Sequence, residues 1–322
     1  MEFSDEAVKF AGPVPPTSPD GRYVAVAVEY RLIVRDWQTL RVVQMYSCLD
    51  RIQHVEWSSD SSYILCGLYD RSIVQVWSIL EPEWTCKIDE GLAGITSARW
   101  CPDGRSILVT AEFQIKATVW SLVDKACVQL AGPKFADAGL AFNPDGTQLA
   151  VAERNNCKDF LTILACSDWK TQVHFQLPTQ DLADLCWSPS GDCLAVWDSL
   201  LTYRLLVYSS YGDQLANYTP YADALGIKTV HWSPCGQFIA VGSYDEAARI
   251  LSHVTWRPLL TCSHTASVSE PSNVVAYREV ASRDDKDTDN STSKYVVCEL
   301  PVSIPSKTPP LDKPDPKLGV GE

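Results

Sequence analysis

The chain has 322 residues, of which 46% are apolar and 21% charged, enough material for one or two folded domains with a sizeable core. Its 27 Lys and Arg side chains against 40 Asp and Glu side chains give a net charge of −13. This balance argues against general binding to nucleic acid or to anionic membranes, which need clustered Lys and Arg, and it leaves protein partners open.

The chain begins with MEFSDEAVKF, which has early acidic residues and no apolar run, so no secretory signal is expected there. Residues 24–28 form one of the longest apolar runs, which is far shorter than the ~20 residues of a membrane helix. We therefore expect a cytoplasmic protein without a membrane anchor. Residues 1–17 are predicted to be an N-terminal segment, in which residues 7–12 could add a strand to the last repeat.

From residue 18 onward, a turn of the Ser-Pro-Asp-Gly type recurs between two apolar runs. The turns begin at Ser18, Ser58, Cys101, Asn143, Ser188 and Ser233. Their second positions are 19, 59, 102, 144, 189 and 234, so successive turns lie 40 to 45 residues apart. This is the period of a four-stranded propeller blade.

Each unit also has the internal order of a blade. An aromatic residue precedes most of the turns, a strand-forming run follows, and a second polar turn leads to a third strand that often ends in Trp or Tyr. Helical periodicity is absent. The sequence therefore predicts an all-β fold, a WD-repeat β-propeller of about six recognisable four-stranded blades over residues 18–280. Whether six repeats close a ring or leave it incomplete stays open.

The repeats are degenerate at their polar positions. The Gly-His pair that usually precedes the first strand of a WD repeat is missing, together with most of its hydrogen-bonded network. Asp70 and Asp245 stand where the turn aspartate of that network belongs. We expect both to be structural, because an aspartate in a turn accepts hydrogen bonds from backbone N–H groups.

Three tryptophans are candidate partner-binding residues. Trp84, Trp169 and Trp256 each follow the end of a third strand by a few residues, which places them at the start of the outermost strand. Exposed tryptophan is enriched at interface hot spots. The alternative, slightly favoured for any one of them, is that each ring covers the edge of its own blade.

The segment of residues 153–159, ERNNCKD, is a second candidate surface. It is an inter-strand loop with more charge than its counterparts, and it includes Lys158 and Asp159. The alternative is that its charges are simply solvated.

No catalytic or metal-binding motif is present. The sequence lacks the nucleophile elbow, the phosphate loop, the dinucleotide fingerprint and the zinc-protease motif. None of the twelve cysteines forms a C-x-x-C pair, and the spacing of Cys157, Cys166 and His174 fits no zinc pattern, so buried thiols are the better interpretation. We expect no enzyme activity, no cofactor, no metal and no small-molecule substrate.

The C-terminal part changes character. Residues 282–294 are polar and charged, and residues 301–322 contain six prolines. Proline at this density is incompatible with a regular central strand. Residues 281–322 are therefore predicted to be a polar and then Pro-rich linker or tail.

Several segments resemble the WD repeat-containing protein 8 family, which is known from centrosomes and spindle poles. They are YRLIVRD (30–36), CLDRIQHVEW (48–57), PEWTCKIDEG (82–91), CKD to CSDW (157–169), LAVWD (194–198) and VGSYD to HVTW (241–256). A further echo is PKLGVG at 316–321. Because members of that family continue into further repeats, the resemblance implies a C-terminally shortened form.

What the resemblance implies is a non-catalytic scaffold at microtubule-organising centres. With a coiled-coil partner from the centrosome or spindle pole, it would support minus-end anchoring, spindle assembly and cilium formation. It also gives more weight to Trp84, Lys158, Asp159, Trp169 and Trp256. Two alternatives remain: an adaptor propeller of another pathway, such as a ubiquitin-ligase substrate receptor or a translation-associated protein, and a propeller enzyme.

Overall fold

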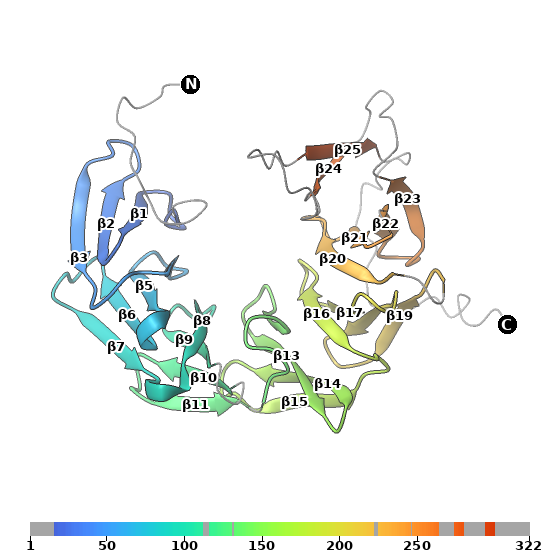
Figure 1. Ribbon diagram of the computed structural model, residues 1–322, viewed down its shortest axis with the longest axis horizontal. Coiled ribbons are helices and arrows are strands. Elements are labelled where there is room, and N and C mark those ends of the chain that lie inside the picture. The colour runs from blue at the N-terminus through green and yellow to red at the C-terminus, as the bar shows by residue number, and fades with distance from the viewer. Residues whose placement is uncertain are drawn as a thin grey trace, which may run out of the picture. The chain divides into compact units, whose positions relative to one another are not determined.

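The computed structural model describes residues 16–111, 116–130, 132–221, 225–245, 247–263, 274–279 and 294–299 (Figure 1). In these ranges the regular elements are antiparallel strands and two short 3-10 turns, η1 (Tyr69–Arg71) and η2 (Gly91–Ala93). The chain divides into two compact units, Met1–His174 and Phe175–Glu322. We describe each unit by itself.

The first unit contains four successive sheets, each built from strands that follow one another in the chain. Their strands are β1 (Tyr23–Val28), β2 (Arg31–Asp36) and β3 (Val42–Ser47); β4 (His54–Trp57), β5 (Tyr63–Leu68), β6 (Ile73–Ser78) and β7 (Thr85–Asp89); β8 (Ile95–Trp100), β9 (Ser106–Ala111), β10 (Lys116–Ser121) and β11 (Cys127–Leu130); and β12 (Leu140–Phe142), β13 (Gln148–Asn155), β14 (Lys158–Ala165) and β15 (Thr171–Gln176). The boundary between the units falls inside β15.

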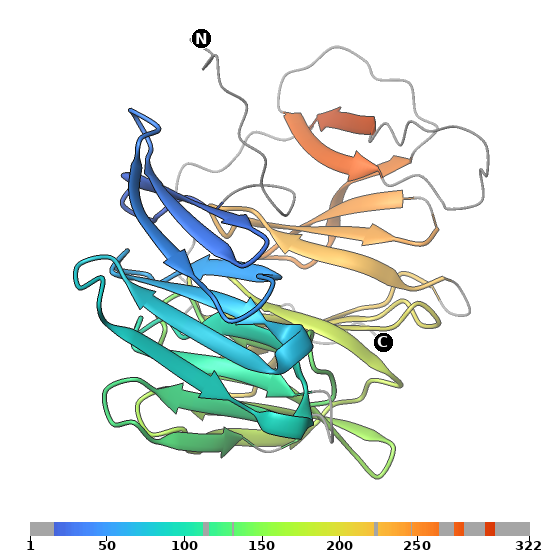
Figure 2. The ribbon, with the colours of Figure 1, turned by 60° about the vertical axis from the view of Figure 1, so that its left-hand side comes forward.

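The second unit repeats the same plan in two sheets and adds a hairpin. Its strands are β16 (Leu182–Trp187), β17 (Cys193–Asp198), β18 (Leu205–Ser209) and β19 (Gln214–Tyr218); β20 (Ile227–Trp232), β21 (Phe238–Ser243), β22 (Ala247–Ser252) and β23 (Pro258–Ser263); and the hairpin β24 (Val274–Glu279) and β25 (Lys294–Glu299). Figure 2 shows the consecutive sheets from a second direction.

The six repeats of the sequence correspond to the first six sheets of the described chain. In the five four-stranded sheets the recurring turn joins the first strand to the second, and in the first sheet it precedes β1. The predicted fold class, an all-β WD-repeat β-propeller, is confirmed by this strand order. The middle strands carry the core: all six residues of β9 and all six residues of β17 are buried. Cys66 and Cys193 are buried and act as small apolar core residues. The thiol of Cys157, which we expected to be buried, is exposed, and that of Cys166 is half-buried.

The first sheet has three regular strands, and a short stretch before them takes the place of its first strand. Thr17 forms an isolated bridge with Val24, and the N–H of Ala25 donates to the carbonyl of Pro16 at 3.0 Å. Residues 16 and 17 therefore belong to the first sheet. Residues 7–12, predicted as a strand for the last repeat, lie outside the described residues.

In five of the six repeats the recurring turn is held by the side chain of its first residue, and in the turn that begins at Cys101 the carboxylate of Asp103 accepts the bond instead. The hydroxyl of Ser58 accepts a hydrogen bond from the N–H of Tyr63 at 2.9 Å and donates to Asp60 at 2.7 Å. The hydroxyl of Ser18 makes the same two contacts, with Tyr23 and Asp20. Each turn thereby satisfies backbone donors that would otherwise lack a partner.

In the second and third sheets, the tryptophan before the turn links its sheet to the previous one. The indole Nε1 of Trp57 donates to the carbonyl of Pro16 at 3.0 Å, and that of Trp100 donates to the carbonyl of Glu56 at 3.2 Å. Both bonds span a little more than 40 residues, one repeat of the chain. At these two positions the indole ring packs between successive sheets while its N–H finds a carbonyl acceptor.

The hairpin β24–β25 differs from the expected linker. Its register runs from Val274 opposite Glu299 to Glu279 opposite Lys294. Residues 294–299, KYVVCE, lie inside the stretch predicted to be linker and tail, and for these six residues that prediction is corrected. The segment is rich in Val and Tyr, which favour strands, whereas the sequence analysis weighed only the polar and Pro-rich stretches on either side of it. The other boundaries of the predicted domains stay predictions.

Candidate interaction surface

Three connections of the second unit meet at one end of its sheets: the turn between β17 and β18, the connection between β19 and β20, and the turn between β21 and β22. The N–H of Gly226 donates to the carbonyl of Leu200 at 2.7 Å, and the N–H of Tyr244 donates to the carbonyl of Gly226 at 3.0 Å. A Cβ on Gly226 would lie 2.3 Å from the carbonyl oxygen of Ser199. Glycine therefore allows the three connections to pack against one another without a gap.

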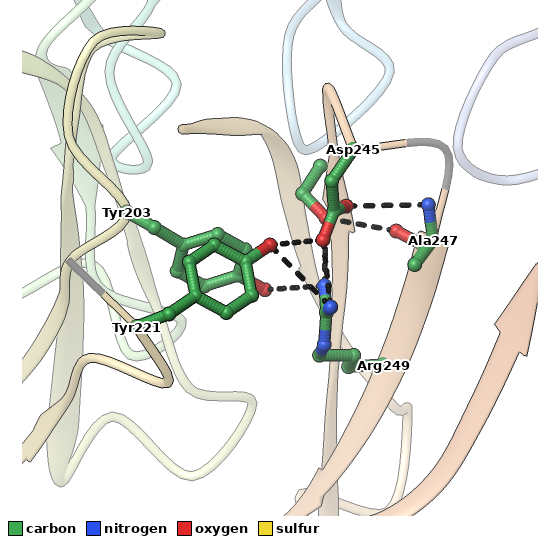
Figure 3. Close-up of polar contacts among 6 residues, drawn as sticks. Tyr203, Tyr221, Asp245, Ala247 and Arg249 are labelled. Carbon is green, nitrogen blue, oxygen red and sulfur yellow. Dashed lines mark hydrogen bonds and ion pairs between the residues drawn. The ribbon is translucent and has the colours of Figure 1, made fainter. Parts of the chain in front are cut away.

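Beneath these connections lies a polar cluster centred on Arg249 (Figure 3). Its guanidinium donates to the carboxylate of Asp245 at 2.6 Å and to the hydroxyl of Ser243 at 2.9 Å. It also reaches the hydroxyls of Tyr203 and Tyr221, both at 3.4 Å, and lies over their rings at 5.2 and 5.5 Å from the centroids. One arginine thus ties together residues from all three connections.

Asp245 completes this cluster. Its carboxylate also accepts hydrogen bonds from the hydroxyls of Tyr221 and Ser243 and from the N–H of Ala247, the last at 3.2 Å. Burial alone would raise the pKa of Asp245, but the bonds from Arg249, Ser243 and Tyr221 outweigh it and lower that pKa to about 2. Burial, together with the bond to Asp245, raises the pKa of Tyr221 to about 12. The cluster therefore holds one fixed ion pair and a neutral tyrosine at neutral pH.

The lowered pKa of Asp245 predicts an acid-sensitive contribution to stability. Because the folded-state pKa lies below the ordinary value of 3.8, the stabilisation is present above about pH 4 and is lost as the pH falls toward 2. We expect the free energy of unfolding of the wild type and of Asp245→Asn to differ at neutral pH and to converge near pH 2. Urea titrations monitored by tryptophan fluorescence at several pH values measure this; a difference that stays constant across that range would contradict it.

Above the cluster, the same connections expose four large apolar side chains. Leu200, Leu201, Leu225 and Tyr244 are 48%, 76%, 51% and 42% exposed, and we call them the Leu–Tyr patch. The ammonium of Lys228 lies 5.8 Å from the centre of the Tyr244 ring. Exposed apolar residues gathered on hydrogen-bonded loops mark a protein-binding surface more often than isolated ones do.

The sequence analysis did not predict this patch. A signal was present, because Leu200 and Leu201 are two adjacent leucines in a turn, where polar residues are the rule. Leu225 and Tyr244 lie far from them in the sequence, and only the folded connections bring the four together.

The two predicted turn aspartates lie in different settings. The carboxylate of Asp70, in η1, accepts a hydrogen bond from the side-chain amide of Gln53, and the N–H of Asp70 donates back to the same side chain, both at 3.0 Å. Asp245 instead belongs to the cluster around Arg249. In the second unit, tyrosine and arginine thus occupy the place of the missing Gly-His network.

The three candidate tryptophans are all half-buried. The ring of Trp84 lies 5.1 Å from that of Tyr63, and the ring of Trp256 meets that of Trp232 edge-on at 6.1 Å. Trp169 packs against the apolar core between the third and fourth sheets. The structure therefore places each ring against its own unit, in line with the covering role that we considered as the alternative. Their role in partner binding stays a prediction.

Trp169 and Trp256 also adopt an unusual backbone conformation. Their φ angles are 57° and 54°, and each N–H donates to a carbonyl four residues earlier at 2.8 Å. The left-handed region costs a bulky residue about 1 kcal/mol relative to glycine. Each indole ring packs against its own surroundings, Trp169 against the apolar core and Trp256 against Trp232, and this packing offsets the cost of the left-handed conformation.

Lys158 and Asp159 lie at the tip of a long hairpin. β13 and β14 have eight residues each and are joined by Asn156 and Cys157, both with positive φ. Lys158 is exposed at the tip. The side chain of Asp159 is fully buried, 3.1 Å from the ammonium of Lys134 and 3.4 Å from the guanidinium of Arg154. Asp159 therefore anchors the hairpin and does not itself face solvent; the partner-binding role of both residues stays a prediction.

The described residues show no arrangement for metal chemistry. No group of three or more His, Cys, Asp or Glu side chains within them is placed to hold a metal ion. His174 stacks on Phe160 at 5.2 Å and shares a hydrogen bond with the hydroxyl of Thr162. Burial raises the pKa of Cys186 to about 12 and that of Cys166 to about 11, which makes both thiols poor nucleophiles. In the same described ranges, no helix has the length and apolar character to cross a membrane.

Residues 212–251 match the family model described as WD domain, G-beta repeat. This stretch runs from the end of the fifth sheet to β22 and includes both Asp245 and Arg249.

Two curated relatives and one solved structure extend the comparison. The mouse protein WD repeat-containing protein WRAP73 is 45% identical over the whole of this chain, which covers 72% of that protein. THO complex subunit 3 from Arabidopsis thaliana is 27% identical over 61% of this chain and 61% of its own length. Hydrazine synthase from Kuenenia stuttgartiensis matches with a TM-score of 0.50 at 15% identity, over 78% of this chain and 80% of that chain, a likeness of fold alone.

The whole-chain match corrects one prediction. The short segments resemble the WD repeat-containing protein 8 family, whereas the relative that aligns over the full length of this chain carries the name WRAP73, so the suggested family name is wrong. The short segments differ from the general WD-repeat consensus, so they pointed to one particular group of WD-repeat proteins. Without an alignment over the whole chain, however, short segments cannot identify which named protein is similar.

Proposed function

The chain belongs to the WD-repeat family, and on that premise we propose that it is a non-catalytic platform on which other proteins assemble. The observation that carries this proposal is the Leu–Tyr patch. Its loops are held by backbone hydrogen bonds and by the Arg249 cluster, so the patch is ordered before a partner binds. A preorganised surface avoids part of the entropy cost of association. The name of THO complex subunit 3 also describes a member of a larger assembly.

The finer proposal concerns place and partner. We propose that the platform works in the cytoplasm, at a centrosome or spindle pole, where it binds a coiled-coil protein and supports microtubule anchoring, spindle assembly and cilium formation. This part rests on the sequence segments quoted above. An amphipathic helix of such a partner fits the patch chemically, because its apolar face can cover three leucines and a tyrosine.

Affinity purification with mass spectrometry tests both levels. We expect the tagged wild-type chain to recover a coiled-coil protein of the microtubule-organising centre, and Leu201→Asp to lose it, because a carboxylate would have to be desolvated in the apolar contact. Tyr211→Asp is the matched control: Tyr211 is 80% exposed in the turn between β18 and β19 of the same unit, outside the patch.

Three other results would change the proposal. Equal recovery with Leu201→Asp would overturn the role of the patch. Ligase subunits or ribosomal proteins in place of a spindle-pole protein would overturn the finer proposal and favour an adaptor of another pathway. Recovery of no protein partner by a folded wild-type chain would contradict the platform itself.

A further inference from the structure

The first sheet carries an unusual share of the exposed apolar side chains. Seven of the eighteen large apolar residues that are exposed in the described chain lie between residues 28 and 49. They are Val28, Tyr30, Trp37, Val42, Val43, Met45 and Leu49. This surface belongs to the first unit and shares no residue with the Leu–Tyr patch of the second unit.

Strand β3 concentrates this apolar surface at the edge of its sheet. Val42, Val43 and Met45 are 52%, 42% and 59% exposed, and we call them the β3 strip. β3 pairs with β2 within its sheet, and no other strand of the described residues is hydrogen-bonded to it. Within the described sheet, alternate N–H and C=O groups of β3 therefore point outward at an edge. The strand therefore offers both backbone hydrogen bonds and apolar contacts to another strand.

The corresponding fourth strands of the other sheets do not share this character. In the described chain, β11 and β19 expose one large apolar residue each, Val128 and Leu215, and β7, β15 and β23 expose none. Edge strands are commonly protected by charged side chains. β7 follows this rule with Lys87 and Asp89, whereas residues 42–47 contain no charge. β11, β19 and β23 are also uncharged, so it is the number of exposed apolar side chains that distinguishes β3.

We propose that β3 is a self-association edge, which pairs with β3 of a second copy of this chain. An antiparallel pairing centred on Gln44 would place Val43 opposite Met45 of the second copy and Met45 opposite its Val43. The segment is thus complementary to itself, as a two-fold symmetric contact requires. Cross-strand pairs of large apolar residues stabilise such a contact.

The charge of the chain favours this location for a contact between copies. Two chains of net charge −13 repel each other, so the electrostatic free energy opposing a contact between them is lowest where the surface is uncharged. The flanking residue Arg41 adds a positive charge at one end of the strand. Because a single strand pair buries less than the ~1,200 Å² of a stable interface, the dimer is expected to be weak and reversible.

This inference goes beyond the proposed function, since it concerns a different surface and a different occupant. Loss of the partner in Leu201→Asp and loss of the dimer in a β3 variant are separate results. Either proposal can fail while the other stands.

Sedimentation velocity of the full chain, from low to several hundred micromolar, tests the proposal. We expect the wild type to shift from monomer to dimer with rising concentration, and to shift further when salt screens the repulsion between copies. Met45→Lys should remain monomeric throughout, because an ammonium group would be buried in the strand pair. Val128→Lys, at a less apolar fourth strand, is the matched control and should behave as the wild type.

A thermal melt of each variant establishes that it is folded. The double variant Val43→Thr with Met45→Thr keeps a strand-forming residue at both positions and removes only apolar surface. If Met45→Lys does not fold, this double variant replaces it in the sedimentation experiment. A wild type that stays monomeric would overturn the proposal. So would a folded β3 variant that dimerises as the wild type does, or a Val128→Lys variant that loses the dimer to the same extent.

Discussion

Gly226→Ala is expected to lower the free energy of unfolding by about 3 kcal/mol. The added Cβ would lie 2.3 Å from the carbonyl oxygen of Ser199 and 2.9 Å from both Leu200 C and the carbonyl oxygen of Thr202. All three are backbone atoms, so no side-chain rotation relieves the clash, and the turn between β17 and β18 must move. Urea unfolding monitored by tryptophan fluorescence measures the change.

Gly132→Ala is the control for this prediction. A Cβ on Gly132 meets no atom within 4 Å, and its φ does not lie in the left-handed region, so we expect a change of less than about 0.5 kcal/mol. Because Gly226 holds Leu200 and Tyr244 by hydrogen bonds, Gly226→Ala should also weaken partner binding at a temperature where it is still folded. An unchanged free energy of unfolding would contradict the packing of the three connections.

Arg249→Leu is expected to have the second large effect: it should lower the free energy of unfolding by about 3 kcal/mol. The side chain of Arg249 is 12% exposed and that of Asp245 is 21% exposed, so removing the cation leaves a largely buried carboxylate without its ion pair. The hydroxyls of Tyr203 and Tyr221 lose their shared contact at the same time. Denaturant titration at pH 7 measures the difference.

Two further variants sharpen this test. Arg257→Leu removes an exposed arginine from the same unit, and its effect should be below about 0.5 kcal/mol. Arg249→Lys should recover only part of the loss, because an ammonium group cannot reproduce the forked contacts with Asp245, Ser243 and the tyrosines. Equal stability of Arg249→Leu and Arg257→Leu would show that the cluster is not what orders these connections.

Local sequence patterns were enough to predict most of the fold. The Ser-Pro-Asp-Gly turns, the aromatic residue before them and the spacing of 40 to 45 residues predicted the six repeats, because each feature operates within one sheet or between successive sheets. Trp57 and Trp100 show the reason: the residue that marks the repeat in the sequence also makes the hydrogen bond that joins one sheet to the previous one.

The candidate surfaces were harder to predict, because they depend on residues brought together from separate repeats. Asp245 was recognised from its place in a turn, but its partner Tyr221 comes from another connection and follows no local motif. The same holds for Tyr203, which contacts Arg249 in the same cluster. Asp159 was chosen for its charge, yet its carboxylate is buried against Lys134, a contact that no spacing rule indicates. The strand Lys294–Glu299 was overlooked because its six residues lie between polar and Pro-rich stretches.

The measurement that tests the platform most directly is hydrogen exchange of the chain with and without the partner recovered by affinity purification. We expect slower exchange on binding at residues 199–202, 225–226 and 244–245, which form and support the Leu–Tyr patch, and unchanged exchange at residues 209–213, which form the turn that contains Tyr211. Unchanged exchange at the patch loops, with protection elsewhere on the chain, would contradict the assignment of the Leu–Tyr patch as the binding surface.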